Sequence, residues 1–350
     1  LALAGCAKSE IDTRGSGPIG FSPNALLTKA LILPGEDAGT DSAFPTSESF
    51  NVFGFAALDG TTYSYTTPLM DDVNISYQSG DWKATEGTYL WPATGKVDFY
   101  AYYPGTLTAA FDLTSEPKGL SLTGVSLGTA IGSQIDPLVA SVLAQDAASK
   151  PKVPLVFKHI TSQIAVTAFD ATETVSLQNN ISIEKVEFKN MKTSGDYREG
   201  TTTGKGAWSN VNTASSFIPF SGSKLLATTE SFLSADESST TVDNNDAFVV
   251  IPEDIVTGTA ADQAIEVTYS VAAYSINGFD YPATPSTVVS VPLYGKVDGN
   301  KLQNGKRYIF HLGLSLDKAN NEIMFSPTVD GWDTVDVRGI VIDVVNNDLM

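Results

Sequence analysis

Few residues in this chain of 350 amino acids could act as a general base near neutral pH. Histidine is the side chain whose unperturbed pKa lies in that range, and the chain contains only His159 and His311. Both lie in apolar runs typical of β-strands, which favours a structural role. A catalytic carboxylate pair could exist among the 40 acidic residues, but sequence spacing does not reveal one. Zinc-ligand spacings, phosphate-binding loops and GxSxG motifs are absent from the sequence, so we predict a protein that is not an enzyme and needs no cofactor or metal.

Two segments match ligand-binding patterns only in part. Residues 15–20 read GSGPIG and fit GxGxxG, but no strand pattern precedes them, no helix pattern follows, and a proline lies inside. Residues 234–246 read SADESSTTVDNND and are rich in the oxygen ligands that calcium prefers. That segment lacks the glycine and the terminal glutamate of a calcium loop, so we expect a solvated polar loop.

The only cysteine of the chain is Cys6, which follows Leu-Ala-Gly. Small residues after a short apolar run are typical of the end of a secretory signal peptide. Leu-Ala-Gly-Cys resembles a bacterial lipobox, in which the thiol carries diacylglycerol. A secreted protein with one cysteine has no internal disulfide, which favours acylation as the role of this thiol. The alternative is an ordinary buried cysteine. We predict lipidation at Cys6.

A polar, glycine-containing stretch follows Cys6 up to residue 20 and is predicted to be a tether. Residues 19–33 are more apolar and could pair as strands. Within them, the Lys29–Ala30 bond joins a basic residue to a small one, the type of bond that a trypsin-like protease cuts. The Arg14–Gly15 bond is an alternative site. Any exposed lysine or arginine is a potential trypsin site, so the chemistry alone leaves both open.

The body of the chain has the pattern of an all-β protein. Residues 48–58 place Phe50 and Val52 on one face, with Phe53 and Phe55 near the other. Residues 136–147 fit either a short helix or a strand. Turn residues separate the strand candidates at regular intervals, which predicts antiparallel β-sandwiches. The further candidates are 97–104, 155–166, 181–188, 217–220, 247–251, 264–274, 288–293, 307–316, 323–329 and 336–345.

The length exceeds that of a usual single core and suggests two domains. We predict a lipoprotein signal remnant and tether at 1–18, an N-terminal β-sandwich at 19–152 and a C-terminal β-sandwich at 153–350. The net charge of −19 argues against nucleic acid, which is bound by basic surfaces. No apolar run approaches the roughly 20 residues that a membrane helix needs, so membrane attachment would rest on the lipid.

Aromatic residues are concentrated before residue 105. They include Trp82, Tyr63 and Tyr65 and the segments YLWP at 89–92 and VDFYAYYP at 97–104. Aromatic side chains are strand formers that fill sandwich cores. The alternative is a platform on which sugar rings stack, as in a monomeric surface lipoprotein that binds glycans through exposed aromatics.

Several sequence segments, taken in order, resemble those of a known protein family. They are the lipobox at Cys6, YLWP at 89–92, VDFYAYYP at 97–104, LVFKHITSQIAV at 155–166, AFVVIPED at 247–254, GKRYIFHLGL at 305–314 and EIMFSPTVDGW at 322–332. As an ordered set, these segments resemble those of Mfa-like fimbrillins, the pilins of type V pili in Bacteroidales. The resemblance implies two tandem transthyretin-like β-sandwich domains and a fimbrial structural subunit or pilus-associated adhesin.

The resemblance also implies a mode of assembly. Such pilins reach the outer membrane as lipoproteins, and a trypsin-like protease removes an N-terminal strand, here with the cut between Lys29 and Ala30. Better-known members have arginine at that position. A donor strand from another pilin subunit then fills the groove, and the mature subunit joins a cell-surface fimbrium. The segment 333–350 is a candidate donor strand, with a permanent last strand of the second domain as the alternative. Its apolar residues are Val335, Val337, Ile340, Val341, Ile342, Val344 and Val345.

Overall fold

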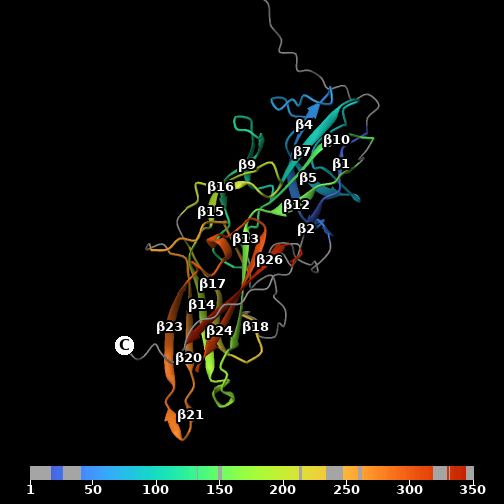
Figure 1. The fold of residues 1–350 in the computed structure, drawn as a ribbon. Helices are drawn as coiled ribbons and strands as arrows, with labels where there is room; N and C mark the ends of the chain where they lie inside the picture. Colours follow the sequence, from blue (N-terminus) through green and yellow to red (C-terminus); the bar gives the residue numbers. More distant parts are fainter. Residues whose placement is uncertain are drawn as a thin grey trace, which may run out of the picture.

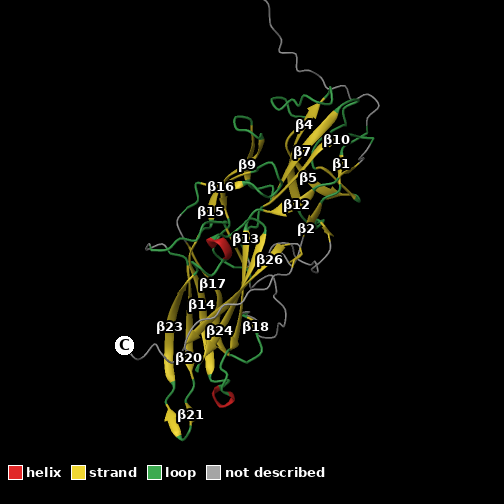
Figure 2. Ribbon diagram, in the orientation of Figure 1, coloured by secondary structure: helices red, strands yellow, loops and turns green. Residues whose placement is uncertain are grey.

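The computed structural model describes residues 17–26, 41–131, 133–148, 152–212, 215–233, 247–258, 262–317, 329–330 and 332–343. The regular elements in these ranges are β-strands, apart from two short 3-10 turns at Val175–Leu177 and Asp298–Asn300. The prediction of an all-β protein is therefore confirmed. The molecule is elongated, with the strands of the first sheet at one end and those of the second and third sheets at the other (Figure 1). Loops connect the strands at both ends (Figure 2).

The first sheet contains ten strands in the order β11-β1-β6-β5-β4-β7-β10-β12-β2-β3. The ends of β11 and β12 are only a few residues apart in sequence, yet these strands lie at or near opposite ends of that order. The sheet must therefore curl until its two ends approach each other. Its strands are β1 (Gly20–Phe21), β2 (Asn24–Leu26), β3 (Asp41–Ala43), β4 (Ser49–Ala57), β5 (Met70–Gln78), β6 (Asp81–Ala84), β7 (Lys96–Tyr103), β10 (Leu138–Gln145), β11 (Lys152–Val153) and β12 (Val156–His159).

Strand β4 is buried on both faces, as its apolar residues predict. Phe50 and Val52 point into the core enclosed by the curled sheet, which we call the first core. Phe53 and Phe55 point to the opposite side, into a separate cluster that we call the middle core. Residues 138–145 form a strand, so of the two structures predicted for residues 136–147, a short helix or a strand, the strand is correct.

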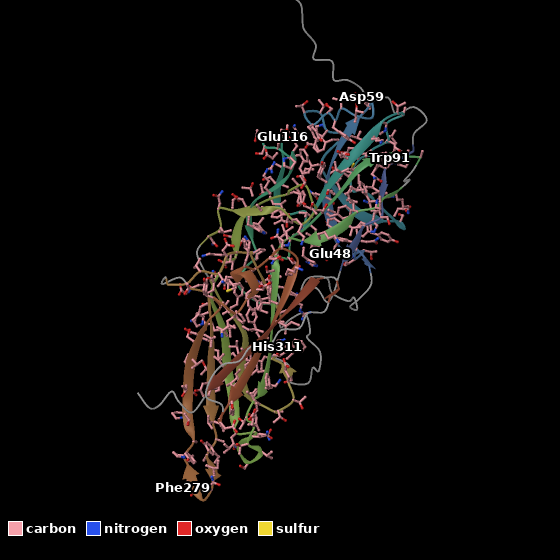
Figure 3. All side chains as sticks on the ribbon, in the orientation of Figure 1. Glu48, Asp59, Trp91, Glu116, Phe279 and His311 are labelled. Carbon is pink, nitrogen blue, oxygen red and sulfur yellow. The ribbon has the colours of Figure 1, made fainter. Side chains whose placement is uncertain are left out.

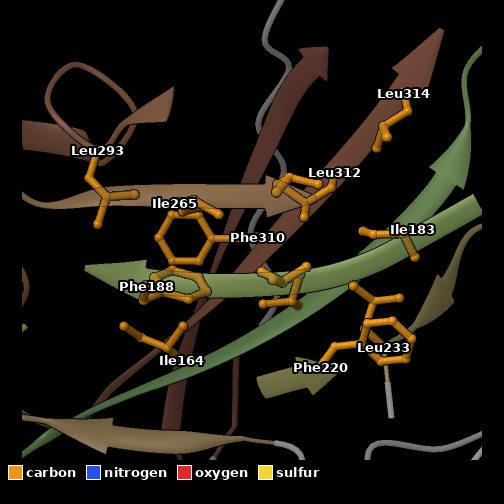
Figure 4. Close-up of a cluster of buried hydrophobic side chains, with 14 of the residues drawn as sticks. Ile164, Ile183, Phe188, Phe220, Leu233, Ile265, Leu293, Phe310, Leu312 and Leu314 are labelled. Atoms are coloured by element: carbon orange, nitrogen blue, oxygen red, sulfur yellow. The ribbon is translucent and has the colours of Figure 1, made fainter. Parts of the chain in front are cut away.

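The second and third sheets pack against each other over the largest apolar cluster, which we call the second core (Figure 4). Phe188 and Phe310 meet there edge to face, with ring centroids 5.2 Å apart. The second sheet contains β13 (Ser162–Asp170), β18 (Ser231–Phe232), β19 (Phe248–Val250), β24 (Lys306–Ser315), β25 (Val329–Asp330) and β26 (Trp332–Asp343). The third sheet contains β14 (Ile181–Met191), β17 (Ser215–Leu225), β20 (Ala264–Val271) and β23 (Thr284–Pro292).

A fourth sheet joins the two halves of the sequence. It consists of β8 (Thr108–Asp112), β9 (Gly119–Ser126), β15 (Ser194–Arg198) and β16 (Ala207–Ser209). Strand β9 from the first half pairs with β15 from the second half, across the predicted boundary at residue 152. This sheet supplies Leu122 and Tyr197 to the middle core, which also contains Phe55. A small hairpin of β21 (Tyr274–Ile276) and β22 (Phe279–Tyr281) forms the far tip, where Phe279 is labelled in Figure 3.

Most strand pairs within the described ranges are antiparallel, as predicted, but four of them are parallel. They are β1 with β11, β2 with β12, β13 with β24, and β24 with β26. Parallel neighbours need long connections, and in the first three pairs the partners lie far apart in sequence. Alternation within a strand says nothing about so distant a partner, so the sequence did not indicate these pairs.

Candidate strand-exchange site

Residues 17–26 form the segment around which the candidate site is built; we call it the leader segment. Its alternating pattern places Ile19, Phe21 and Pro23 inward, where all three are buried. Gly17, Pro18 and Ser22 face solvent. This alternation is the strand signal seen in the sequence, and its apolar side lines the first core.

Backbone hydrogen bonds hold the leader segment on both sides. On one side, Ile19 N donates to Tyr89 O at 2.8 Å, and Trp91 N donates to Gly17 O at 3.2 Å. On the other side, Ser22 N donates to Val153 O at 2.8 Å, and Asn24 N donates to Leu155 O at 2.7 Å. The segment thus lies between residues 89–91 and 153–155, and its strand β1 is inserted between β6 and β11 of the first sheet.

Phe21 is the central side chain of the insertion. Its ring packs edge to face on Phe50, with centroids 6.1 Å apart, and on Phe99 at 5.8 Å. It is 1 % exposed and belongs to the first core. Removing the leader segment would open an apolar slot beside Phe50 and Phe99 and would leave backbone groups of residues 89–91 and 153–155 unpaired.

An ion pair spans the leader segment at Gly20, which lies in β1 between β11 and β6. Lys152 of β11 pairs in register with Gly20, and its Nζ reaches Asp81 Oδ1 of β6 at 2.5 Å. A Cβ at Gly20 would lie 3.8 Å from Lys152 Cγ, so the lysine side chain runs close above the glycine. The lysine hydrogen bond and charge lower the pKa of Asp81.

The C-terminal candidate donor strand is β26, and it pairs in parallel with β24 along nearly its whole length. Val335 lies opposite Tyr308, Val337 opposite Phe310, Ile340 opposite Leu312, Val341 opposite Gly313 and Ile342 opposite Leu314. In this structure the strand therefore completes its own second sheet. Whether it also serves another subunit stays a prediction.

Several predicted site residues lie outside the described residues. They are Cys6, Arg14, Gly15, Lys29, Ala30, Val344 and Val345, together with the acidic segment 234–246. The leader segment ends at Leu26, three residues before the predicted cut. Lipidation at Cys6 and both cleavage sites stay predictions.

Both histidines lie buried in strands beside carboxylates. His159 Nδ1 lies 2.7 Å from Asp136 Oδ2, and Thr161 Oγ1 donates to the other oxygen of Asp136 at 2.7 Å. His311 Nδ1 contacts Glu230 and also lies 2.9 Å from Thr167 Oγ1. The group around His159 is fully buried, whereas Glu230 beside His311 is partly exposed; both arrangements are suited to fixing strands.

The aromatic residues of the N-terminal half mostly fill the cores. Trp91, Phe99 and Tyr102 are 2 %, 0 % and 0 % exposed, and Trp82 is 8 % exposed. The Tyr102 hydroxyl donates to Asp72 Oδ1 at 2.6 Å, and burial raises its pKa. These rings therefore offer little surface for stacking a sugar.

No helix in the part of the chain that the structure describes is long and apolar enough to cross a membrane. Within the described ranges, no three histidine, cysteine, aspartate or glutamate side chains lie together as ligands for a metal ion.

Comparison with known proteins decides the family. The model of the fimbrillin-like family matches residues 38–332. The chain belongs to the fimbrillin-like family. The resemblance seen in the sequence is thereby confirmed. No curated protein matches the chain.

Similar solved structures carry related descriptions. A fimbrial protein from Bacteroides vulgatus is 16 % identical, with 77 % of this chain and 89 % of that chain covered and a TM-score of 0.47. A candidate cell adhesion protein from Bacteroides ovatus is 16 % identical, with 86 % and 93 % covered and a TM-score of 0.47. The fimbrial anchor protein Mfa2 from Porphyromonas gingivalis is 12 % identical, with 77 % and 82 % covered and a TM-score of 0.26. Because each TM-score is below 0.5, the family assignment rests on the family match alone.

Proposed function

We propose that this fimbrillin-like protein is a fimbrial structural subunit or pilus-associated adhesin that polymerises by strand exchange. In this proposal the chain is exported as a lipoprotein on Cys6 and held at the outer membrane. A trypsin-like protease then cuts after Lys29, and the mature subunit joins a cell-surface fimbrium. The observation that carries the proposal is the insertion of the leader segment, with Ile19 and Phe21 buried in the first core.

Loss of the leader segment would leave the first domain in an unfavourable state. Burying a large apolar side chain stabilises a fold by roughly 1.5–3 kcal/mol, so Ile19 and Phe21 together contribute about 3–6 kcal/mol. The strands beside the slot would also present unpaired N–H and C=O groups, which form a template for another strand. A strand from a second subunit that inserts apolar side chains would restore both kinds of contact.

The segment 333–350 is the proposed donor. The leader segment offers an apolar residue at every second position, in Ile19, Phe21 and Pro23. The C-terminal segment contains the same spacing in Ile340, Ile342 and Val344. To serve as a donor, strand β26 would have to leave β24. The alternative is that β26 is a permanent strand of the second sheet. Partners would then be other pilin subunits and the maturation protease.

The first experiment tests maturation. The full chain is treated with trypsin, and the products are run on a gel without boiling and sequenced from the N-terminus. We expect a new N-terminus at Ala30 and a ladder of multimers. Lys29→Ala should abolish both, whereas Arg14→Ala should leave both unchanged. Cleavage that leaves a monomer would contradict strand exchange, and a ladder that persists in Lys29→Ala would contradict the cut site.

A second experiment tests the donor without altering the second sheet. A fluorescent peptide of residues 333–350 is titrated onto the trypsin-treated chain, and binding is followed by fluorescence anisotropy. We expect saturable binding to the cleaved chain, none to the uncleaved chain, and competition by a peptide of residues 17–29. A scrambled 333–350 peptide is the matched control. If only the 17–29 peptide binds, the C-terminal segment is a permanent strand.

A further inference from the structure

A cavity of about 430 Å³ lies where the fourth sheet meets the second sheet, far from the leader segment. Strand β16 forms one wall, at the junction between the two ends of the molecule (Figure 1). Residues 252–254 and 301–304 form the other walls. All of the lining residues belong to the described chain, and none is used in strand exchange.

Hydrogen bonds tie the three walls together. Asn304 Nδ2 donates to Gly206 O at 2.9 Å, and Leu302 N donates to Glu253 O at 2.9 Å. Gly206 must be glycine, because a Cβ there would lie 2.1 Å from Arg198 O. The cavity is therefore a fixed part of the fold, as expected of a binding site that exists before its ligand arrives.

Trp208 supplies an aromatic wall. One side of its indole packs on Tyr197, with ring centroids 5.2 Å apart and planes at 57°. Its Nε1 donates to Ile160 O at 2.8 Å, so the ring cannot turn freely. The side chain is half-buried and lines the cavity. A fixed, partly exposed indole offers a flat apolar surface at little entropic cost.

Polar groups surround this aromatic wall. Gln303 is exposed, and among the described residues its side-chain amide makes no hydrogen bond that would have to be broken. Lys301 Nζ lies 3.0 Å from Asp254 Oδ1, and both side chains are largely exposed. Lys205 is exposed and has no ion pair among the described residues. The cavity also contains the carboxylates of Glu253 and Asp254. Because Lys301 pairs with Asp254, Lys205 is the cation that is left for an acidic ligand among the described lining residues.

We propose that this cavity binds an acidic saccharide, with one sugar ring on Trp208 and its carboxylate near Lys205. A pyranose ring has a face of C–H groups that packs on an indole and an edge of hydroxyl groups that bond to Gln303, Asn304 and Asp254. An apolar surface with a few placed polar groups is the usual composition of a small-ligand site. The proposal does not depend on strand exchange, since the cavity and the leader segment are separate.

The test uses the full, uncleaved chain and three probes. They are D-glucuronate, D-galacturonate and N-acetylneuraminate, and D-glucose, D-galactose and N-acetylglucosamine serve as neutral counterparts. Binding is measured by saturation-transfer NMR and by the quenching of tryptophan fluorescence. We expect at least one acidic probe to bind and its neutral counterpart to bind at least about tenfold more weakly. The proposal is overturned if none of the acidic probes binds, or if a neutral sugar binds equally well.

Substitutions inside and outside the cavity test where the acidic sugar binds. Trp208→Ala should reduce affinity at least about tenfold, and Lys205→Gln and Gln303→Ala should each reduce it severalfold. Because Trp208 also packs on Tyr197, the two exposed substitutions keep the test valid if Trp208→Ala folds poorly. Phe279→Ala, at an aromatic residue that is 71 % exposed, and Lys96→Gln are matched controls that should bind as the parent does. Equal binding by Lys205→Gln, Gln303→Ala and the controls would place the ligand elsewhere and overturn the assignment.

Discussion

The first and second cores differ in which parts of the chain close them. The second core is built from residues 164–316, and its two sheets present long strands such as β14 and β24 to each other. The first core includes Ile19 and Phe21 from a short segment whose partners β6 and β11 lie far along the chain. The second core is thus closed by the body of the chain, whereas the first depends on an insertion that could be exchanged.

The largest expected effect comes from removing the insertion. A chain that lacks residues 1–29 loses the burial of Ile19 and Phe21, about 3–6 kcal/mol, and the backbone bonds beside them. We expect a lower first transition in calorimetry and an unchanged transition for the second core. A chain that lacks only residues 1–16 is the control and should unfold as the parent does. Adding the 17–29 peptide to the shorter chain should restore the first transition; a normal transition without peptide would show that the first core closes without the insertion.

A single substitution sharpens the comparison. Phe21→Ala removes a buried ring from the first core, and such a change costs about 3–5 kcal/mol. Phe310→Ala removes a fully buried ring from the second core and should cost a similar amount. Urea unfolding of the uncleaved chain measures both costs. After trypsin treatment and refilling by a donor strand, the effect of Phe21→Ala should disappear and that of Phe310→Ala should remain.

The fourth sheet, which joins the two regions, should make stability depend on pH. Burial raises the pKa of Glu199 to about 7 from 4.5, although the Tyr197 hydroxyl and Gly204 N donate to its carboxylate. A raised pKa means that the folded protein binds the proton more tightly, so this stabilisation is complete below about pH 4.5 and is lost as the pH rises through about 7.

Glu199→Gln should therefore flatten the pH dependence. The shift of Glu199 corresponds to a change on the order of 3 kcal/mol in the free energy of unfolding over that window. Urea unfolding near pH 5 and pH 8 measures the difference, which should be smaller in the variant than in the parent. Glu86→Gln, at an exposed position, is the control and should behave as the parent. An unchanged difference in Glu199→Gln would assign the pH dependence to other groups.

The smallest effect concerns the ion pair that spans the leader segment. Lys152→Gln removes the contact with Asp81, and both side chains are about half exposed, so equilibrium stability should change little. In the trypsin-treated chain, the rate at which the donor peptide replaces the leader should rise, because the ion pair that spans Gly20 is lost. Stopped-flow anisotropy with the labelled 333–350 peptide measures that rate. Lys118→Gln breaks the exposed pair with Glu116 away from the site and should leave the rate unchanged.

The sequence predicted the positions of the strands better than it predicted which strands pair with each other. Alternation at Phe50, Val52, Phe53 and Phe55 indicated both a strand and the faces it presents, because these are local properties. The family resemblance implied that an N-terminal strand fills a groove, but β6 and β11 could not be predicted as the partners of Phe21, since they are distant and the pairing is parallel on one side. The Trp208 cavity was missed for the same reason: its walls come from three segments that are brought together only by the fold.

The pairing of β9 with β15 has a mechanical consequence. Residues 160 and 161 connect the last strand of the first sheet to the first strand of the second, and alone they would act as a thin hinge. Because β9 and β15 are also hydrogen-bonded, a tension that pulls the two ends of the molecule apart must shear a sheet as well as straighten that link. In a fibre of such subunits, stretching would therefore meet resistance from this sheet within each subunit.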